Sequence, residues 1–385
     1  MIPLSVPHIS GNEWTYIKEC LDTEWVSSAG KYVDKFEEEI CQFTKAKYAT
    51  GCVNGTAALQ IALLVAGVKP DEEVIVPTVT FIATVNVVRY VNAFPVFMDC
   101  DDFYNIDLVK TMEFIKTNTI YKNGFTYNKS TGRKISAIIP VHIFGNAVDI
   151  EEFFEEIRSR NIKIVEDAAE SIGTYYTKGK LSDNYTGTIG DVGCFSFNGN
   201  KIITTGGGGM VVTNNQNYAR TAKYLTTQAK DDGIYYIHDA IGYNFRLTNI
   251  QAALGVAQLE RLNEYIVIKK RNYDIYKEQI NQVDGLSIAE VPSFASSNYW
   301  FYCLRVDKSY GRNIHELIRY LGENDIQARP IWKLNHLQTP YQTCQSYKIE
   351  RAQILYENTI NIPCSVNLSK SDIEKVVNTL HDGKR

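Results

Sequence analysis

The sequence lacks the features that mark a membrane, exported or zinc-binding protein. None of its runs reaches the roughly 18 uninterrupted apolar residues of a membrane span. The N-terminus, MIPLSVPHISGNEW, has no basic segment followed by a long apolar one. The eight cysteines include no C-x-x-C pair and no cluster with histidine at zinc spacing. We therefore expect a cytoplasmic protein with reduced thiols, without membrane contact and without a metal.

A strong charge of one sign is also missing. The formal net charge is −4 and the pI is about 5.9, so the chain has no overall basic field of the kind that nucleic-acid binding requires. We therefore expect no nucleic-acid partner, and an anionic ligand would need local donors. The 44% hydrophobic and 22% charged residues are ordinary for a folded globular protein.

Between about residues 45 and 215 the sequence alternates strand patterns with helix patterns. This alternation predicts an α/β fold with a mostly parallel, mixed sheet flanked by helices. The expected strands cover residues 74–76, 94–98, 137–141, 162–165, 193–197 and 210–213. Helices are expected at residues 56–66 and 149–160. The polar, turn-rich residues 123–134 predict an exposed hairpin or insertion.

The C-terminal third of the chain has a different pattern. Apolar residues at positions 250, 253, 254 and 257 predict a long helix that leaves the first domain. Beyond it, helices mix with strands such as residues 299–306, which is typical of an α+β unit. Because 385 residues exceed the usual size of a single core, we assign residues 1–262, including an N-terminal arm, to a large ligand-binding domain. Residues 263–385 form the expected small C-terminal domain.

An apolar strand pattern ends at Val165 in a run of acids that includes Asp167 and Glu170. Ligands of open α/β sheets bind beyond the carboxyl ends of the strands, so Asp167 occupies a position where a site is expected. The alternative is a helix cap or a surface acid, which is the more common role of an acid at a strand end.

A lysine, Lys201, follows the next expected strand, after Ser196 and a loop of glycine and asparagine. The glycine run 206–209 lies nearby. Lys201 could be a solvated loop lysine, and the glycines could form a plain turn. They lack the G-x-G-x-x-G pattern after a first strand, which disfavours a nicotinamide site.

The third motif is a turn of small residues, Asn54-Gly55-Thr56, which leads directly into an expected helix. A helix N-terminus offers free N–H groups and a partial positive charge, so Gly55 and Thr56 could hold a phosphate. An ordinary capped helix is the alternative. Together, a phosphate cradle, an acid able to pair with a ring nitrogen and a lysine able to form a Schiff base are what pyridoxal 5′-phosphate (PLP) requires.

Over nearly its whole length the sequence resembles the DegT/DnrJ family of PLP-dependent sugar aminotransferases, which have the aspartate aminotransferase fold (fold type I). The resemblance is carried by the segments Gly55-Thr56-Ala57-Ala58-Leu59, Pro77-Thr78-Val79-Thr80-Phe81, Val141-His142-Ile143-Phe144-Gly145, Glu166-Asp167-Ala168-Ala169, Ser196-Phe197 to Lys201, and Gly242-Tyr243-Asn244-Phe245-Arg246. Their common order makes a chance match improbable.

The resemblance implies a role for each matched residue. Lys201 would bond to the cofactor, and Asp167 would face its pyridine nitrogen. Gly55, Thr56 and Ser196 would hold the phosphate, and Phe81 would stack on the ring, with a core aromatic as the alternative. Asn244 would reach the cofactor of a neighbouring subunit, which implies a homodimer with shared sites. Glu170 lies beside the cofactor's phenolic oxygen where many relatives carry Gln or His, so its role stays open.

The substrate side follows from the same resemblance. The segments 198–209 and 225–230 resemble the LegC-like branch, whose members aminate C4 of a nucleotide-linked 4-keto-6-deoxy-N-acetylhexosamine for legionaminic or related acids. The expected amino donor is glutamate, and the nucleotide can be UDP or GDP. The expected substrate-binding residues are Trp25, Ser27, Ser28, His142, Arg329, Trp332 and His336; each has a structural role as its alternative, and for His142 a core position is favoured.

The sequence opposes three functions other than amino transfer. Family members that dehydrate sugars replace the lysine with histidine, so the lysine at position 201 opposes a dehydratase. A regulator that binds PLP without turnover is opposed by the presence of both Lys201 and Asp167. A nicotinamide-dependent dehydrogenase is opposed by the missing glycine fingerprint.

Overall fold

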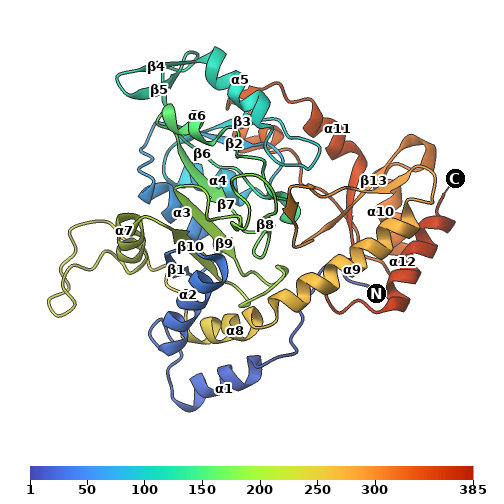
Figure 1. The fold of residues 1–385 in the computed structure, drawn as a ribbon, viewed down its shortest axis with the longest axis horizontal. Helices are drawn as coiled ribbons and strands as arrows, with labels where there is room; N and C mark the ends of the chain where they lie inside the picture. The colour runs from blue at the N-terminus through green and yellow to red at the C-terminus, as the bar shows by residue number, and fades with distance from the viewer. Residues whose placement is uncertain (385) are drawn as a thin grey trace.

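The computed structural model describes residues 1–384, and a ten-stranded mixed sheet flanked by helices forms its centre (Figure 1). Along the main path of the sheet the order is β1 (Tyr48–Cys52), β10 (Gly209–Thr213), β9 (Val192–Ser196), β7 (Lys163–Asp167), β6 (Lys134–Ile138), β2 (Glu73–Pro77), β3 (Phe94–Met98) and β15 (Ser346–Tyr347). The pairs from β9 to β15 are parallel, whereas β10 is antiparallel to both its neighbours. This confirms the expected fold class.

Most of the expected strands lie where the sequence patterns place them, and the differences have local causes. Strand β6 begins and ends three residues earlier than expected because Thr126 and Tyr127 of β5 (Phe125–Asn128) pair with its start and lengthen it there. It stops before Pro140, which has no N–H to donate. Strand β1 was not expected at all, since its sequence YATGC has no alternation of apolar and polar residues.

A hairpin forms where the sequence predicts one, but it covers Thr119–Asn128 and so begins before the expected residues 123–134. Asn123 and Gly124 both have positive φ, of 52° and 80°, as a two-residue type I′ turn requires. They join β4 (Thr119–Lys122) to β5, which returns to β6 through residues 129–133.

Of the two helices expected beside the large sheet, α3 begins one residue earlier than expected, directly after the cap residue Asn54, whereas α6 has no side-chain cap. Helix α6 is shorter than the predicted residues 149–160, because residues 150–153 form a turn that buries Ile150. The expected long helix is two helices, with a break at residues 260–261. The helices are α1 (Glu13–Asp22), α2 (Lys31–Thr44), α3 (Gly55–Val65), α4 (Ala83–Tyr90), α5 (Leu108–Asn118), α6 (Phe154–Ser159), α7 (Gln216–Thr226), α8 (Asn249–Leu259), α9 (Leu262–Ile280), α10 (Ile314–Glu323), α11 (Arg351–Asn358) and α12 (Lys370–Asp382).

The C-terminal segments build a second, four-stranded sheet with its own core, in orange to red at the right of Figure 1. Its order is β11 (Leu286–Ile288), β13 (Tyr302–Val306), β16 (Thr359–Ile362) and β14 (Arg329–Pro330). The N-terminal arm lies against this part of the chain: Ile2 donates to the Asp325 carbonyl and accepts from the Gln327 N–H. The α+β character matches the expectation, and the domain division at residue 262, where α9 begins, stays a prediction.

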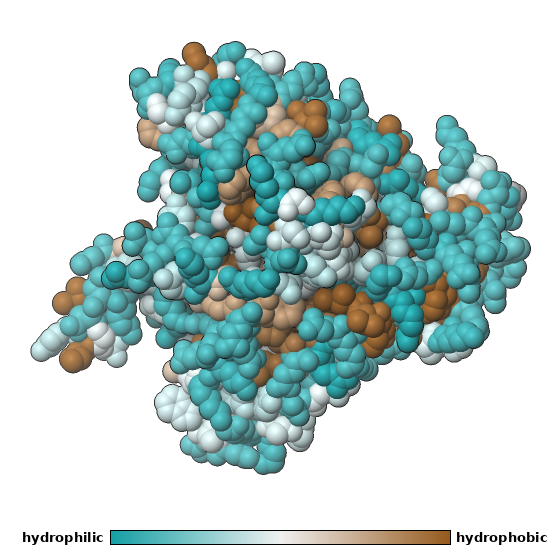
Figure 2. Space-filling view, viewed as in Figure 1, coloured by the Kyte–Doolittle hydropathy of each residue, from teal (hydrophilic) through white to brown (hydrophobic). Residues whose placement is uncertain are grey.

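A long projection, residues 228–243, extends from the large sheet after α7, at the left of Figures 1 and 2. Its apolar side chains point outward, with Ile234, Tyr235 and Ile241 each more than three-quarters exposed. Among residues 1–384, none of the helices combines the length and apolar content needed to cross a membrane. The cytoplasmic location stays a prediction.

Candidate active site

A cavity of about 460 Å³ lies where β7 and β9 end and α3 begins, with the C-terminal part of the chain along its other side. Asp167 is the last residue of β7, Ser196 is the last residue of β9, and Gly55 is the first residue of α3. Nine of the residues expected from the sequence line this cavity: Gly55, Thr56, Phe81, Asp167, Glu170, Ser196, Lys201, Arg329 and Trp332.

The start of α3 forms a cradle suited to an anion. The Asn54 side chain accepts from the Ala57 N–H at 2.8 Å, while the N–H groups of Gly55 and Thr56 have no acceptor within the helix. A Cβ atom at position 55 would lie 2.7 Å from the Ser196 Cβ, so only glycine lets the helix start approach the end of β9. The hydroxyls of Thr56 and Ser196 and the N–H groups of Gly55 and Thr56 thereby lie at one end of the cavity, as in phosphate sites at helix N-termini.

Asp167 is buried, which excludes the alternative of a surface acid. Its Oδ2 accepts from the Thr84 hydroxyl at 2.6 Å and its Oδ1 accepts from the Ala169 N–H at 3.0 Å. Burial raises the pKa of Asp167, and the two hydrogen bonds oppose that rise. Each oxygen keeps a further lone pair, so the carboxyl group could pair with a cationic ring nitrogen in the cavity.

Lys201 is not a solvated loop lysine, since its side chain is only 12% exposed. Its Nζ lies 3.8 Å from the Glu170 Oε1 and 3.8 Å from the centre of the Trp300 ring. Burial lowers the pKa of Lys201, while the carboxylates of Glu170 and Asp167 oppose that change. A buried lysine with a lowered pKa is suited to act as a nucleophile or a base.

Glu170 is held between the protein backbone and Lys201. Its Oε2 accepts from the Phe144 N–H at 2.8 Å, which leaves Oε1 to face the lysine. Burial raises the pKa of Glu170 to about 7, against the opposing effects of Lys201 and of that hydrogen bond. The cavity therefore contains a second acid, whose pKa burial raises above its ordinary range.

Three expected residues lie where the cavity opens to solvent. Phe81 is 53% exposed, so the alternative of a core aromatic does not hold. Its ring meets that of Trp332 edge to face at 6.4 Å, and Trp332 stacks on Phe144 at 4.9 Å. Arg329, on the edge strand β14, is exposed and brings a positive charge to this opening.

The two histidines that were expected to bind substrate do not line the cavity. His142 is buried in the core, where its Nε2 lies 2.9 Å from the Glu166 Oε2 and its Nδ1 accepts from the Val148 N–H. This is the core position that the sequence favoured. His336 bonds through Nδ1 to the Thr78 hydroxyl at 2.7 Å, and this bond fixes it against the end of β2.

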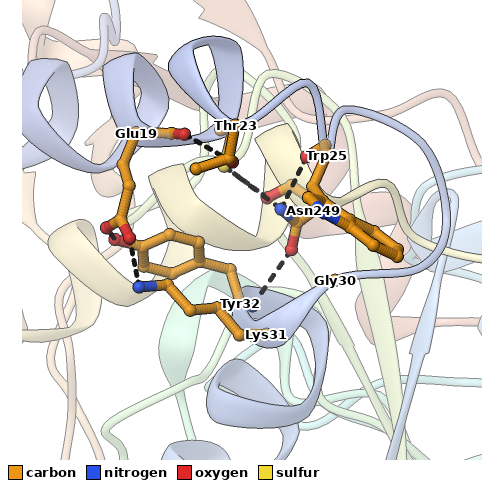
Figure 3. A pocket seen from close by; sticks show the side chains of 8 residues that line it. Glu19, Thr23, Trp25, Gly30, Lys31, Tyr32 and Asn249 are labelled. Carbon is orange, nitrogen blue, oxygen red and sulfur yellow. Dashed lines mark hydrogen bonds and ion pairs between the residues drawn. The ribbon is translucent and has the colours of Figure 1, made fainter.

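Trp25, Ser27, Ser28 and Asn244 also lie away from the cavity of their own chain. Trp25 lines a separate pocket between α1 and the start of α2, where Asn249 donates to its carbonyl at 2.7 Å (Figure 3). The carbonyl of Ser27 accepts from the Asn249 N–H at 2.6 Å, and Ser28 follows in the same loop. Asn244 is exposed beside the base of the projection, where it pairs with Thr227.

Several cavity residues were not singled out from the sequence: Leu4, Thr84, Trp300, Phe301 and Asn361. Only Thr84 has a local signal, since it lies three residues after the 77–81 segment. The others come from the N-terminal arm and the C-terminal part of the chain. These residues reach the cavity only because the two parts pack against the large sheet, and local sequence patterns do not predict that packing.

Comparison with known proteins agrees with this geometry. The sequence profile of the DegT/DnrJ/EryC1/StrS aminotransferase family matches residues 7–381. The chain is 37% identical to the GDP-perosamine synthase of Escherichia coli O157:H7, over 99% of this chain and 98% of that protein. It is 35% identical to EpsN of Bacillus subtilis, named as a pyridoxal phosphate-dependent aminotransferase, over 98% of this chain and 95% of that protein.

Solved structures show the same fold. A DegT DnrJ EryC1 StrS aminotransferase from Brucella abortus superposes with a TM-score of 0.86 at 27% identity, covering 96% of this chain and 95% of that chain. The family assignment rests on three findings. The family profile matches nearly the whole chain, and two relatives exceed 30% identity over nearly their full length. One cavity also brings together a lysine, an acid and an anion cradle. The chain belongs to the DegT/DnrJ/EryC1/StrS aminotransferase family.

Proposed function

We propose that the chain is a PLP-dependent aminotransferase that adds an amino group to a keto-sugar carried by a nucleotide. The observation that carries this proposal is the convergence of the Lys201 amine, the Asp167 carboxyl group and the α3 cradle on one cavity. These groups match the aldehyde, the ring nitrogen and the phosphate of PLP in chemical type. The name of the Bacillus subtilis relative supports the same cofactor.

Each residue has a defined task in this proposal. When bound, PLP supplies an aldehyde that bonds to amines and a ring that takes up electrons. The cradle of Gly55, Thr56 and Ser196 would hold the phosphate, and Phe81 would cover one face of the ring. Asp167 keeps the ring nitrogen protonated, because a nearby carboxylate favours the cation. The Lys201 Nζ takes the proton from the α-carbon of the amino donor, which we propose is glutamate.

For the acceptor we propose a 4-keto-6-deoxy-N-acetylhexosamine, aminated at C4 and linked to UDP or GDP, for legionaminic or other surface amino sugars. The sequence segments 198–209 and 225–230 support this sugar. The name of the Escherichia coli relative, a GDP-perosamine synthase, favours GDP as the nucleotide and makes a GDP-linked sugar without an N-acetyl group the second candidate.

We further propose a homodimer with shared sites. Asn244, Trp25, Ser27 and Ser28 lie outside the cavity of their own chain, and Asn244 adjoins an exposed apolar projection. A second copy that covers the projection would bring these residues to the neighbouring cavity. Large exposed apolar patches commonly mark such contacts.

The experiment that tests the function is a glutamate-coupled assay with a panel of UDP-linked and GDP-linked 4-keto sugars, with and without the N-acetyl group. We expect one keto-sugar to yield an amine at C4, identified by mass and NMR. An enzyme that aminates only keto acids would contradict the sugar substrate, and loss of water from the sugar would favour the dehydratase.

The cofactor has its own test. We expect the purified protein to be yellow, and Lys201→Ala to lose both the absorption band and more than about 100-fold of its activity, because the covalent attachment and the base are removed together. Wild-type protein that stays colourless after incubation with PLP would contradict the proposal. Bound cofactor without turnover on any amino acceptor would favour the regulator.

A further inference from the structure

The Lys201 amine lies between two side chains that are themselves fixed. On one side is the Glu170 Oε1, at 3.8 Å, and on the other is the face of the Trp300 ring, at 3.8 Å from its centre. Sequence patterns left the role of Glu170 open and did not single out Trp300. Both residues line the cavity, so the arrangement belongs to the active site.

Trp300 is anchored at each of its polar atoms. Its Nε1 donates to the Asn200 carbonyl at 2.7 Å, its N–H donates to the Asn298 side chain at 3.0 Å, and its carbonyl accepts from the Cys364 thiol at 3.1 Å. The side chain is 2% exposed and stacks on Phe301 at 4.0 Å. The ring therefore presents its face to Lys201 in one fixed orientation.

Glu170 is anchored independently of the lysine. Its Oε2 accepts from the Phe144 N–H, and its carbonyl accepts from the Asn298 side chain at 2.9 Å. Phe144 has a φ of 56°, a left-handed conformation that non-glycine residues adopt at a cost. Asn298 thus bonds to both Glu170 and Trp300, and it holds the two sides of the arrangement together.

We propose that Glu170 and Trp300 form a holding site for the Lys201 amine whenever the lysine is not bonded to the cofactor. The inference rests on the proposed function, because an aminotransferase must release its lysine in each half-reaction. A carboxylate and an aromatic face both attract an ammonium group, and desolvation strengthens these attractions. The holding site keeps a long, flexible side chain in place, and it stabilises the ammonium form that Lys201 takes once it has accepted the proton of the donor.

The charges around the lysine are consistent with this role. Two charged groups act on Lys201: Asp167, the last residue of β7, and Glu170, which follows β7. Each favours the ammonium form of the lysine. Burial acts in the opposite direction. Glu170 and Trp300 thus offset part of the cost of enclosing the amine. They act through Lys201 and are positioning residues.

The test measures the proton affinity of Lys201 directly in the protein freed of PLP. Lysines are labelled with trace acetic anhydride across a pH series, and the extent at each lysine is read by peptide mass spectrometry. We expect Glu170→Gln to lower the pH midpoint of Lys201 labelling by about one unit or more. Trp300→Leu should lower the midpoint by about half a unit to one unit.

Trp300→Phe separates the two properties of the tryptophan. It keeps an aromatic face but loses the Nε1 bond to Asn200, so its shift should be smaller than that of Trp300→Leu. Lys333, which is exposed and lies outside the cavity lining, is the internal reference, and its midpoint should not move. If Trp300→Leu does not fold, Glu170→Gln and Trp300→Phe carry the comparison.

Unchanged Lys201 midpoints in both Glu170→Gln and Trp300→Leu would overturn the holding site. A Trp300→Phe shift as large as that of Trp300→Leu would overturn the role of the ring face. These outcomes are independent of turnover. The proposed function fails by a different result, namely wild-type protein that cannot be loaded with PLP.

Discussion

The residue at position 55 shows how one side chain atom decides whether a ligand fits. A Cβ there would lie 2.7 Å from the Ser196 Cβ, closer than two carbon atoms can approach without displacement. We expect Gly55→Ala to push α3 away from β9 and weaken PLP binding by about tenfold or more, a loss of about 1.4 kcal/mol. Titration of the cofactor-free protein with PLP, followed by absorbance, measures the change.

Gly199 provides the matched control for this prediction. It lies in the loop before Lys201, and a Cβ at that position would meet no atom within 4 Å. Gly199→Ala should therefore bind PLP as the wild type does. Equal affinities of the Gly55→Ala and wild-type proteins would show that the cradle does not hold the phosphate.

Thr84 controls the protonation of Asp167 through one hydrogen bond. The bond stabilises the charged carboxylate, so its removal in Thr84→Val should raise the pKa of Asp167 further above its usual range. Asp167 must be ionised to hold a ring nitrogen protonated. We expect the acid limb of the kcat/KM profile to move upward by about one pH unit.

Thr84→Ser retains the hydroxyl and should keep the wild-type profile. A Thr84→Val profile with an unmoved acid limb would mean that another group sets this limb.

At the scale of elements, Asp99 ties the C-terminal segment to the large sheet. It follows β3, and its carboxylate accepts from Lys110 and from the N–H groups of residues 350–352, where α11 begins. Burial raises the pKa of Asp99, but these four donors outweigh burial and hold it below its usual value. The group thus stabilises the fold above its unfolded pKa of about 3.9, and this contribution is lost as the pH falls through the lower, folded pKa.

Asp99→Asn should therefore lower the free energy of unfolding at pH 7 by about 2 kcal/mol. It should also remove part of the loss of stability below about pH 4. Urea unfolding at pH 7 and below about pH 4 measures the two effects.

Asp102, which pairs with Arg351 but is exposed, is the control, and Asp102→Asn should change the free energy of unfolding by less than about 1 kcal/mol. Equal effects of the two substitutions would contradict the assigned role of Asp99.

The elements also show what the sequence could and could not predict. Strands β2, β3, β7, β9 and β10 are buried and rich in β-branched or aromatic residues, so their pattern is local. The α3 cradle and Asp167 follow from motifs at the ends of such elements. Trp300 and Asn361 reach the cavity only through tertiary packing, and the break between α8 and α9 interrupts an apolar periodicity that continues across it.

At the scale of the whole molecule, one chain leaves its site incomplete under the proposed function. The projection, residues 228–243, exposes Ile234, Tyr235 and Ile241 to solvent (Figure 2). Asn244 lies at its base and outside the cavity of its own chain. An isolated chain would pay a solvation cost for these apolar side chains without any gain. Under the proposed homodimer, a second copy that covered the projection would remove this cost and would supply Asn244 to the neighbouring site.

A mixed dimer tests this arrangement. If Lys201 of one chain works with Asn244 of the other, a dimer of one Lys201→Ala chain and one Asn244→Ala chain has one intact site and one site with both changes. Co-expression with two tags isolates this mixed dimer. We expect it to have about half of the wild-type activity, whereas each single-variant dimer is strongly impaired.

A mixed dimer of Lys201→Ala and Asp167→Asn is the control. Both residues serve the cavity of their own chain, so each site is damaged and no activity returns. Activity of the first mixed dimer no greater than the average of its parents would mean that Asn244 does not cross between subunits.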